Sequence, residues 1–164
     1  MLTLASQQKK YLIAFIAVIA LLSGAAWLQF YLGVNPCPLC ILQRITLGIL
    51  GVLFFIGIII SRYRFGQITV GLFSVLFSVL GIVLSGRQVW LQLSPASAGA
   101  NCEVSLQYML QALPVLQVLQ KILAGGAECS QIGWQFMHLS LAQWSLIAFV
   151  IFLLFSLWQL IKAK

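Results

Sequence analysis

Long apolar segments separated by shorter polar ones dominate the chain. We expect membrane-spanning helices over residues 11–32, 41–60, 65–84 and 144–161. Each segment is long enough, at a rise of about 1.5 Å per residue, to cross a hydrocarbon core about 30 Å thick. The pattern therefore predicts an all-α membrane protein in which residues 1–164 form a single four-transmembrane-helix bundle.

The first apolar segment allows a second interpretation. Its small residues Ser23-Gly24-Ala25 resemble the cleavage site of a secretory signal peptide. The apolar run continues to Leu32, well beyond such a site. We therefore interpret the segment as an uncleaved span.

Small residues recur at intervals of three and four in two of the segments. They are Gly71, Ser74, Ser78, Gly81 and Ser85 in the third segment and Ala17, Ala20 and Gly24 in the first. This spacing places them on one helix face, and membrane helices pack closely through such faces because lipid supplies no hydrophobic drive for association. Both stripes are predicted to be packing surfaces, not binding sites.

The segments 33–40 and 86–143 are predicted loops on one side of the membrane. In the longer loop, apolar residues recur at helical spacing over 106–113 and 116–123. Short apolar helices of this kind lie in the membrane interface with the apolar face toward the lipid. We therefore expect a long loop that carries short interfacial helices.

Composition and charge support the membrane assignment and orient the chain. Of its 164 residues 62% are hydrophobic and 7% charged, with nine lysines and arginines against two acidic residues. In a membrane protein this basic excess reports topology, so we expect no nucleic-acid partner. Most basic residues lie at the two termini and in the turn near residue 62, and such residues favour the cytoplasmic side. Both termini are thus predicted to be cytoplasmic, and both loops to lie outside.

Two cysteines mark the start of the second span, in the sequence Cys37-Pro38-Leu39-Cys40. Proline suits the first position of a helix, which would leave Cys40 in the first turn. Free N–H groups and the positive end of the helix dipole favour a thiolate there. Arg44 lies four residues further, on the same helix face, where a guanidinium stabilises the anion and donates hydrogen bonds to a ligand carbonyl.

Other interpretations of these residues are open. A Cys-x-x-Cys pair also occurs in zinc sites, but Cys102 and Cys129 form no second short pair and the chain has one histidine. The four cysteines also suit inert structural disulfides, because all lie on the predicted oxidising side. Arg44 alone is typical of an arginine that extends to the interface. One pair at membrane level and one in an exposed loop favour a redox relay.

A polar group ends the third span on the same side as the dithiol. Arg87 and Trp90 are typical of interface anchors. Gln88, between them, is a candidate hydrogen-bond donor to a lipid-soluble ligand, although its spacing alone is a weak signal.

Together these residues resemble the disulfide bond formation protein B family (DsbB), and the resemblance covers essentially the whole chain. The residues that carry it are Cys37-Pro38-Leu39-Cys40, Arg44, Arg87-Gln88-Val89-Trp90-Leu91-Gln92, Pro95, Cys102, Tyr108-Met109-Leu110, Cys129 and Trp134-Gln135-Phe136. Family members often carry histidine at the position of Gln88, and an amide also donates a hydrogen bond.

The resemblance implies an enzyme of the bacterial inner membrane, a thiol:quinone oxidoreductase. Its partners would be a periplasmic thioredoxin-like thiol oxidase, DsbA, and a membrane quinone, either ubiquinone or menaquinone. DsbA would attack Cys102, Cys129 would attack Cys37, and Cys40 would pass electrons to the quinone. Arg44 would hold the quinone and stabilise the Cys40 thiolate. The family's redox cysteines are periplasmic and no metal is implied.

Two further classes of protein share some of these features. Quinone reductases like vitamin K epoxide reductase are also four-helix bundles with a Cys-x-x-Cys pair, but their pair lies near the end of the last helices, whereas here it opens the second span. A small membrane scaffold with two structural disulfides is the non-enzymatic alternative.

Overall fold

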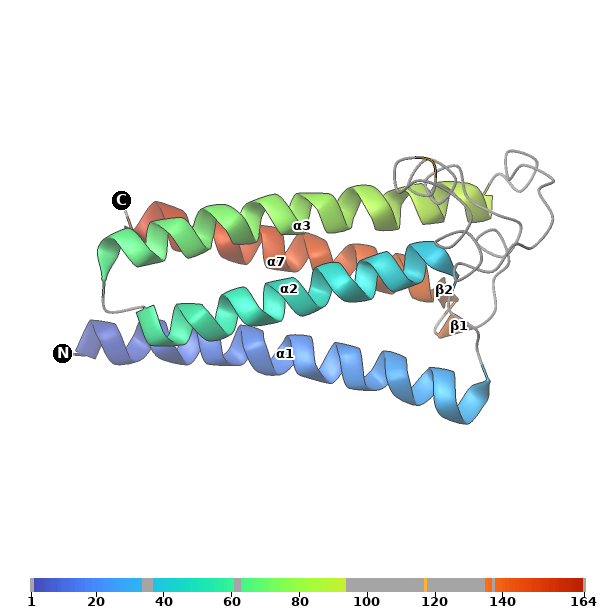
Figure 1. Ribbon diagram of the computed structural model, residues 1–164, viewed down its shortest axis with the longest axis horizontal. Helices are drawn as coiled ribbons and strands as arrows, with labels where there is room; N and C mark the ends of the chain where they lie inside the picture. Colours follow the sequence, from blue (N-terminus) through green and yellow to red (C-terminus); the bar gives the residue numbers. More distant parts are fainter. Residues whose placement is uncertain are drawn as a thin grey trace.

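The computed structural model describes residues 2–33, 37–60, 63–93, 117, 135–136 and 138–163. The helices are α1 (Leu2–Leu32), α2 (Pro38–Ile60), α3 (Arg64–Leu93) and α7 (Leu141–Ala163). Two short strands, β1 (Gln135–Phe136) and β2 (Leu139–Ser140), precede α7 and pair antiparallel (Figure 1).

All four helices are long and apolar enough to cross a membrane, which confirms the predicted four-helix membrane bundle for the part of the chain that the structure describes. The helix ends differ from those expected from hydropathy. α3 continues past the expected end at residue 84 to Leu93, and α2 and α7 begin at Pro38 and Leu141, each three residues before the expected start. The predicted interfacial helices at 106–113 and 116–123 lie outside the described residues except for residue 117, which is helical.

The helices pack in the order α1, α2, α3, α7, each against the next, whereas α1 and α7 make few contacts. Both termini lie at one end of the bundle and the strands at the other (Figure 1). Near the termini α1 approaches α7, where the rings of Tyr11 and Phe155 meet edge to face with centroids 6.1 Å apart. Toward the strands α1 diverges from the other helices, which leaves a gap at that end (Figure 1).

The core lies between the middle of the helices and the end with the termini. Its fully buried members come from all four helices: Tyr11, Ala14, Val18, Leu50, Phe54, Val70, Phe149 and Phe152. The Phe54 ring contacts those of Phe152 and Phe155, with centroids 5.6 Å and 5.8 Å away. Aromatic packing thus joins α2 to α7 across the bundle interior.

The small-residue face of α3 is a packing surface, as predicted. Its members Gly71, Ser74, Ser78, Gly81 and Ser85 are all buried. A Cβ at Gly81 would lie 2.3 Å from the Phe149 ring, and one at Gly71 would lie 2.7 Å from Leu160. Any side chain at these positions would collide with α7, so the glycines set how closely the two helices approach.

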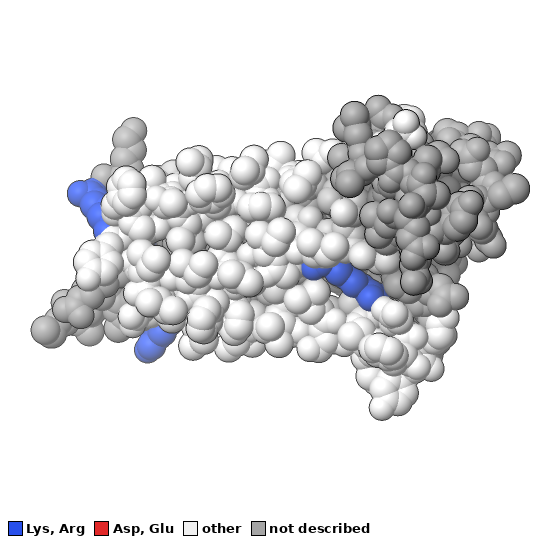
Figure 2. Space-filling model, in the orientation of Figure 1, with Lys and Arg blue, Asp and Glu red and all other residues white. Residues whose placement is uncertain are grey.

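The outer surface is apolar along the described helices, and its basic side chains lie mostly at one end (Figure 2). On the face drawn in Figure 2, basic side chains gather at the end that carries the termini, and a further basic side chain lies in the bundle wall toward the other end. Exposed aliphatic and aromatic side chains cover the sides of every helix. This distribution is that of a bundle surrounded by lipid.

Ser140, the last residue of β2, links the start of α7 to the end of α3 through hydrogen bonds. Ser140 caps α7, because its Oγ accepts a hydrogen bond from the Gln143 N–H at 3.4 Å and its own N–H donates to Gln143 Oε1 at 2.8 Å. The Ser140 hydroxyl also donates to Gln92 Oε1 on α3 at 2.7 Å. These bonds hold the first turn of α7 beside the last turns of α3.

Candidate functional site

The two cysteines of the Cys-x-x-Cys sequence form the start of α2. Pro38 is the first helical residue, which confirms the predicted helix start, and the Cys37 carbonyl accepts the Ile41 N–H at 3.1 Å. Cys37 Sγ lies 3.4 Å from the Cys40 N–H, so the sulfur occupies the place of a capping oxygen. The first turn of α2 therefore holds the Cys37 sulfur against its own Cys40 N–H.

The sulfurs are present as two thiols and contact each other. The Cys37 S–H donates to Cys40 Sγ at 3.0 Å, and the amide Nε2 of Gln88 donates to the same sulfur at 3.0 Å. The distance from Gln88 Nε2 to Cys37 Sγ is longer, 3.5 Å. Cys40 is thus the sulfur with two short donors, an arrangement suited to a sulfur that carries negative charge.

Arg44 lies one turn below Cys40 and contacts α1. Its guanidinium donates to Gln29 Oε1 and, at 3.0 Å, to the Ala25 carbonyl. These bonds attach α1 to α2 near the point where α1 diverges from the bundle. They also hold a positive charge at the depth of the first helical turn, close to the Cys40 sulfur.

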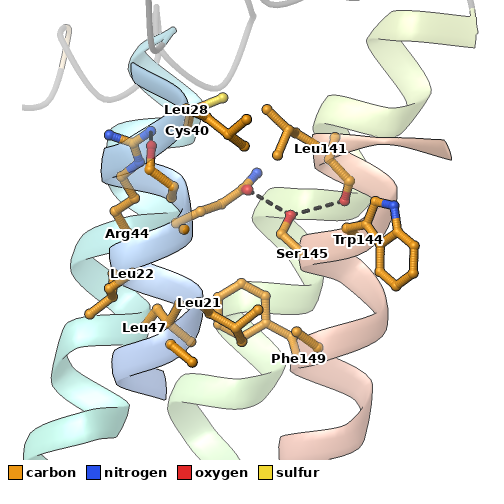
Figure 3. A pocket seen from close by; sticks show the side chains of 16 residues that line it. Leu21, Leu22, Leu28, Cys40, Arg44, Leu47, Leu141, Trp144, Ser145 and Phe149 are labelled. Atoms are coloured by element: carbon orange, nitrogen blue, oxygen red, sulfur yellow. Dashed lines mark hydrogen bonds between the residues drawn. The ribbon is translucent and has the colours of Figure 1, made fainter. Parts of the chain in front are cut away.

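A cavity of about 270 Å³ opens beside Cys40, between α1, α2 and α7. Cys40 and Arg44 lie at one end, and Leu21, Leu47 and Phe149 at the other (Figure 3). Ser145 and Trp144 on α7 face them across the gap between α1 and α7. The cavity is therefore apolar along its length and polar at the end that reaches the sulfur.

Two residues predicted to pack helices line this cavity instead. Ala20 and Gly24 are exposed and form part of its wall, and a Cβ at Gly24 would meet no atom within 4 Å. The prediction was wrong for both, because α1 no longer packs against α7 at this level, although it still contacts α2 through Ala25 and Gln29. Ala17, one turn earlier, packs against the core as expected.

Gln88 lies against the two sulfurs and does not line the cavity. Its predicted contact with a lipid-soluble ligand stays a prediction. Gln43 and Ser145, which sequence analysis did not single out as site residues, connect to it: the Ser145 hydroxyl lies 2.8 Å from Gln43 Oε1, and Gln43 Nε2 lies 2.7 Å from Gln88 Oε1. The signal for Gln43 was in the sequence, since it is a polar residue that interrupts the apolar span 41–60 near its start.

Cys102 and Cys129 lie outside the described residues, so their pairing and distance from Cys37 stay predictions. Within the described chain, the structure brings together Cys37, Cys40 and Gln88, with Arg44 one turn away. This arrangement places the Cys40 sulfur beside a mostly apolar cavity.

Comparison with known proteins agrees with this chemistry. The family model "Disulfide bond formation protein DsbB" matches residues 7–159. The chain is 38% identical to Disulfide bond formation protein B 1 of Pseudomonas aeruginosa over 97% of this chain and 98% of that protein. It is 34% identical to Disulfide bond formation protein B of Stutzerimonas stutzeri, with the same coverage, and 32% identical to that of Xanthomonas euvesicatoria over 97% of this chain and 93% of that protein.

Proposed function

Because the chain belongs to the disulfide bond formation protein B family, and is therefore a membrane protein of disulfide bond formation, we propose that it reoxidises the periplasmic thiol oxidase DsbA and passes the electrons to a membrane quinone. The observation that carries this proposal is the cavity, which leads from the lipid-exposed gap between α1 and α7 to the Cys40 sulfur. A scaffold with structural disulfides has no need of such an access route.

The residues of the cavity fit a quinone. Its apolar length suits an isoprenoid-bearing ring, and its few polar groups gather at one end. There the Arg44 guanidinium would donate a hydrogen bond to a ring carbonyl, and Ser145 lies on the opposite wall. A quinone, when bound, takes up two electrons and two protons.

The relay conserves electrons at each step. A DsbA thiolate attacks Cys102, which breaks the Cys102–Cys129 bond and forms a mixed disulfide. Cys129 then attacks Cys37, which breaks the Cys37–Cys40 bond and leaves Cys40 as a thiolate. The second DsbA thiol attacks the mixed disulfide, which completes the DsbA disulfide and releases Cys102. Cys102 then attacks Cys129 in the Cys129–Cys37 bond, which restores the Cys102–Cys129 disulfide and releases Cys37 beside Cys40. This reduced pair would give two electrons and two protons to the quinone and close to the Cys37–Cys40 disulfide, so each cycle removes two electrons and two protons from DsbA.

The energetics require a strongly oxidising acceptor. DsbA has a potential of about −120 mV, and a difference of about 30 mV corresponds to about 1.4 kcal/mol for this two-electron couple. A membrane quinone supplies that acceptor. The excess of basic residues near the termini supports a cytoplasmic location of both ends, with the dithiol at the periplasmic side of the inner membrane.

Quinone absorbance provides the direct test. Purified protein in detergent should reduce ubiquinone or menaquinone analogues when reduced DsbA is supplied, and should not do so without it. The Cys102→Ala variant should lose transfer from DsbA while Cys37 and Cys40 remain able to form a disulfide. Failure of the wild-type protein to reduce either quinone with reduced DsbA would reject the proposed function.

A substitution that fills the cavity tests where the quinone binds. Gly24→Leu should raise the KM for quinone about tenfold, because the new side chain enters a space that no other atom occupies. Gly48→Leu is the matched control, since its Cβ also meets nothing within 4 Å and Gly48 does not line the cavity. Equal KM values for the two variants would place the quinone elsewhere.

A further inference from the structure

A hydrogen-bonded chain crosses the bundle interior and ends at the sulfurs. It runs from Ser145 on α7 through Gln43 on α2 to Gln88 on α3, and from there to Cys40. Gln43 and Gln88 are only 6% and 4% exposed, at a depth where lipid surrounds the bundle. Buried amides in such a place destabilise a protein unless their groups are paired, so a chain of this kind has to be fully connected.

The chain determines which way the Gln88 amide points. Gln88 Oε1 lies 2.7 Å from Gln43 Nε2, which is a donor, so the other end of the amide, its NH₂ group, faces the sulfurs. Gln43 is held in turn at Ser145, whose hydroxyl donates toward Gln43 Oε1 at 2.8 Å and toward the Ala142 carbonyl at 2.9 Å. Rotation of Gln88 by half a turn would place two NH₂ groups together and a carbonyl oxygen against Cys40. That arrangement is unfavourable once Cys40 is negatively charged.

The geometry also distinguishes the two sulfurs. Cys40 Sγ has donors at 3.0 Å from both Cys37 and Gln88. Cys37 Sγ has longer contacts, 3.4 Å to the Cys40 N–H and 3.5 Å to Gln88. Hydrogen bonds that involve an ionised group are shorter and about twice as strong as neutral ones. Negative charge on the reduced pair is therefore best accommodated at Cys40, the sulfur that lines the cavity.

We propose that Gln88 is a catalytic residue that stabilises the Cys40 thiolate through its amide N–H, and that Gln43 and Ser145 are positioning residues that aim this amide. The inference rests on the proposed function, in which Cys40 is the sulfur that delivers electrons. Its consequence is thermodynamic: an interaction present only with the reduced, charged sulfur raises the reduction potential of the Cys37–Cys40 pair. Gln88, which is neutral, thereby makes the Cys37–Cys40 disulfide a stronger oxidant without adding a charge to the bundle.

The test measures the thiol–disulfide equilibrium of this pair against a dithiothreitol redox buffer. The full-length chain carries Cys102→Ser and Cys129→Ser, so that Cys37 and Cys40 are the remaining cysteines, and quinone is removed. Gln88→Met keeps the length of the side chain and removes the donor. We expect its equilibrium constant to shift about tenfold toward the disulfide, which corresponds to about 30 mV. Gln92→Met, one turn further along α3, should shift the constant less than twofold, since Gln92 pairs with Ser140.

The positioning role has its own prediction. Gln43→Leu should shift the equilibrium about threefold in the same direction, because Gln88 keeps its donor but loses its orientation. In the Gln88→Met background the same change should add nothing, since it acts only through Gln88. Additive shifts would show that Gln43 acts independently, and an unchanged constant in Gln88→Met would refute the role of Gln88.

These outcomes are separable from a failure of the proposed function. The equilibrium is measured without DsbA and without quinone, so it reports on Gln88 even if no electrons reach a quinone. A protein that reduces quinone normally but shows no shift in Gln88→Met retains the proposed function and loses this inference. Thermal unfolding in detergent identifies any variant whose bundle is perturbed.

Discussion

Cys40→Ser is expected to abolish catalytic quinone reduction, lowering the rate with reduced DsbA by at least about a thousandfold. A hydroxyl at this position neither forms a disulfide with Cys37 nor carries a reducing electron pair to the cavity. The substitution is nearly isosteric, so the bundle should retain its thermal stability. The measurement is the loss of quinone absorbance with DsbA as electron donor.

The same variant separates the two halves of the relay. The substitution leaves Cys102 and Cys129 in place, so under the proposed relay reduced DsbA should still form a mixed disulfide with Cys102. Non-reducing electrophoresis and mass spectrometry follow this step. Turnover within about tenfold of the wild-type rate would contradict the assignment of Cys40, since electrons would then leave by another sulfur.

Arg44→Met has the second-largest expected effect, a loss of roughly ten- to a hundredfold in kcat/KM for quinone. A hydrogen bond to a charged group contributes about 1.5–3 kcal/mol, and among the described residues Arg44 is the one charged group of the cavity wall. The loss should fall mainly on the KM for quinone if Arg44 holds the ring. It should also shift the Cys37–Cys40 equilibrium toward the disulfide if the guanidinium stabilises the Cys40 thiolate.

Two controls distinguish this role from helix anchoring. Arg87→Met removes a charge from α3 away from the cavity and should leave the KM for quinone unchanged within about twofold. Gln29→Leu removes one partner of Arg44 on α1 but keeps the charge, so its effect should be smaller than that of Arg44→Met. If Gln29→Leu and Arg44→Met lose the same activity, Arg44 serves only to attach α1 to α2.

Physical patterns in the sequence accounted for the membrane bundle. Uninterrupted apolar segments identify membrane spans whatever the arrangement of the helices, whereas small residues at intervals of three and four became a helix contact throughout α3 but only in part of α1. The first turn of α2 was predictable because Pro38 and Cys40 are close in sequence and one turn of helix determines their geometry. The end of α3 was less predictable, because hydropathy placed it at residue 84 whereas the helix continues to Leu93. The added turns carry polar side chains, and one of them, Gln92, accepts a hydrogen bond from Ser140.

The sequence by itself therefore determined the class of protein and the presence of a dithiol at a helix start next to an arginine. Only the tertiary structure decided that α1 diverges from α7, that Ala20 and Gly24 line a cavity instead of a helix contact, and that Gln88 bonds to the sulfur and, through Gln43, connects to Ser145. The physical reason is the range of the interactions. Hydropathy, capping and helical spacing act over a few residues, whereas the cavity and the amide chain depend on side chains about 45 to 100 positions apart that meet only when four helices are packed.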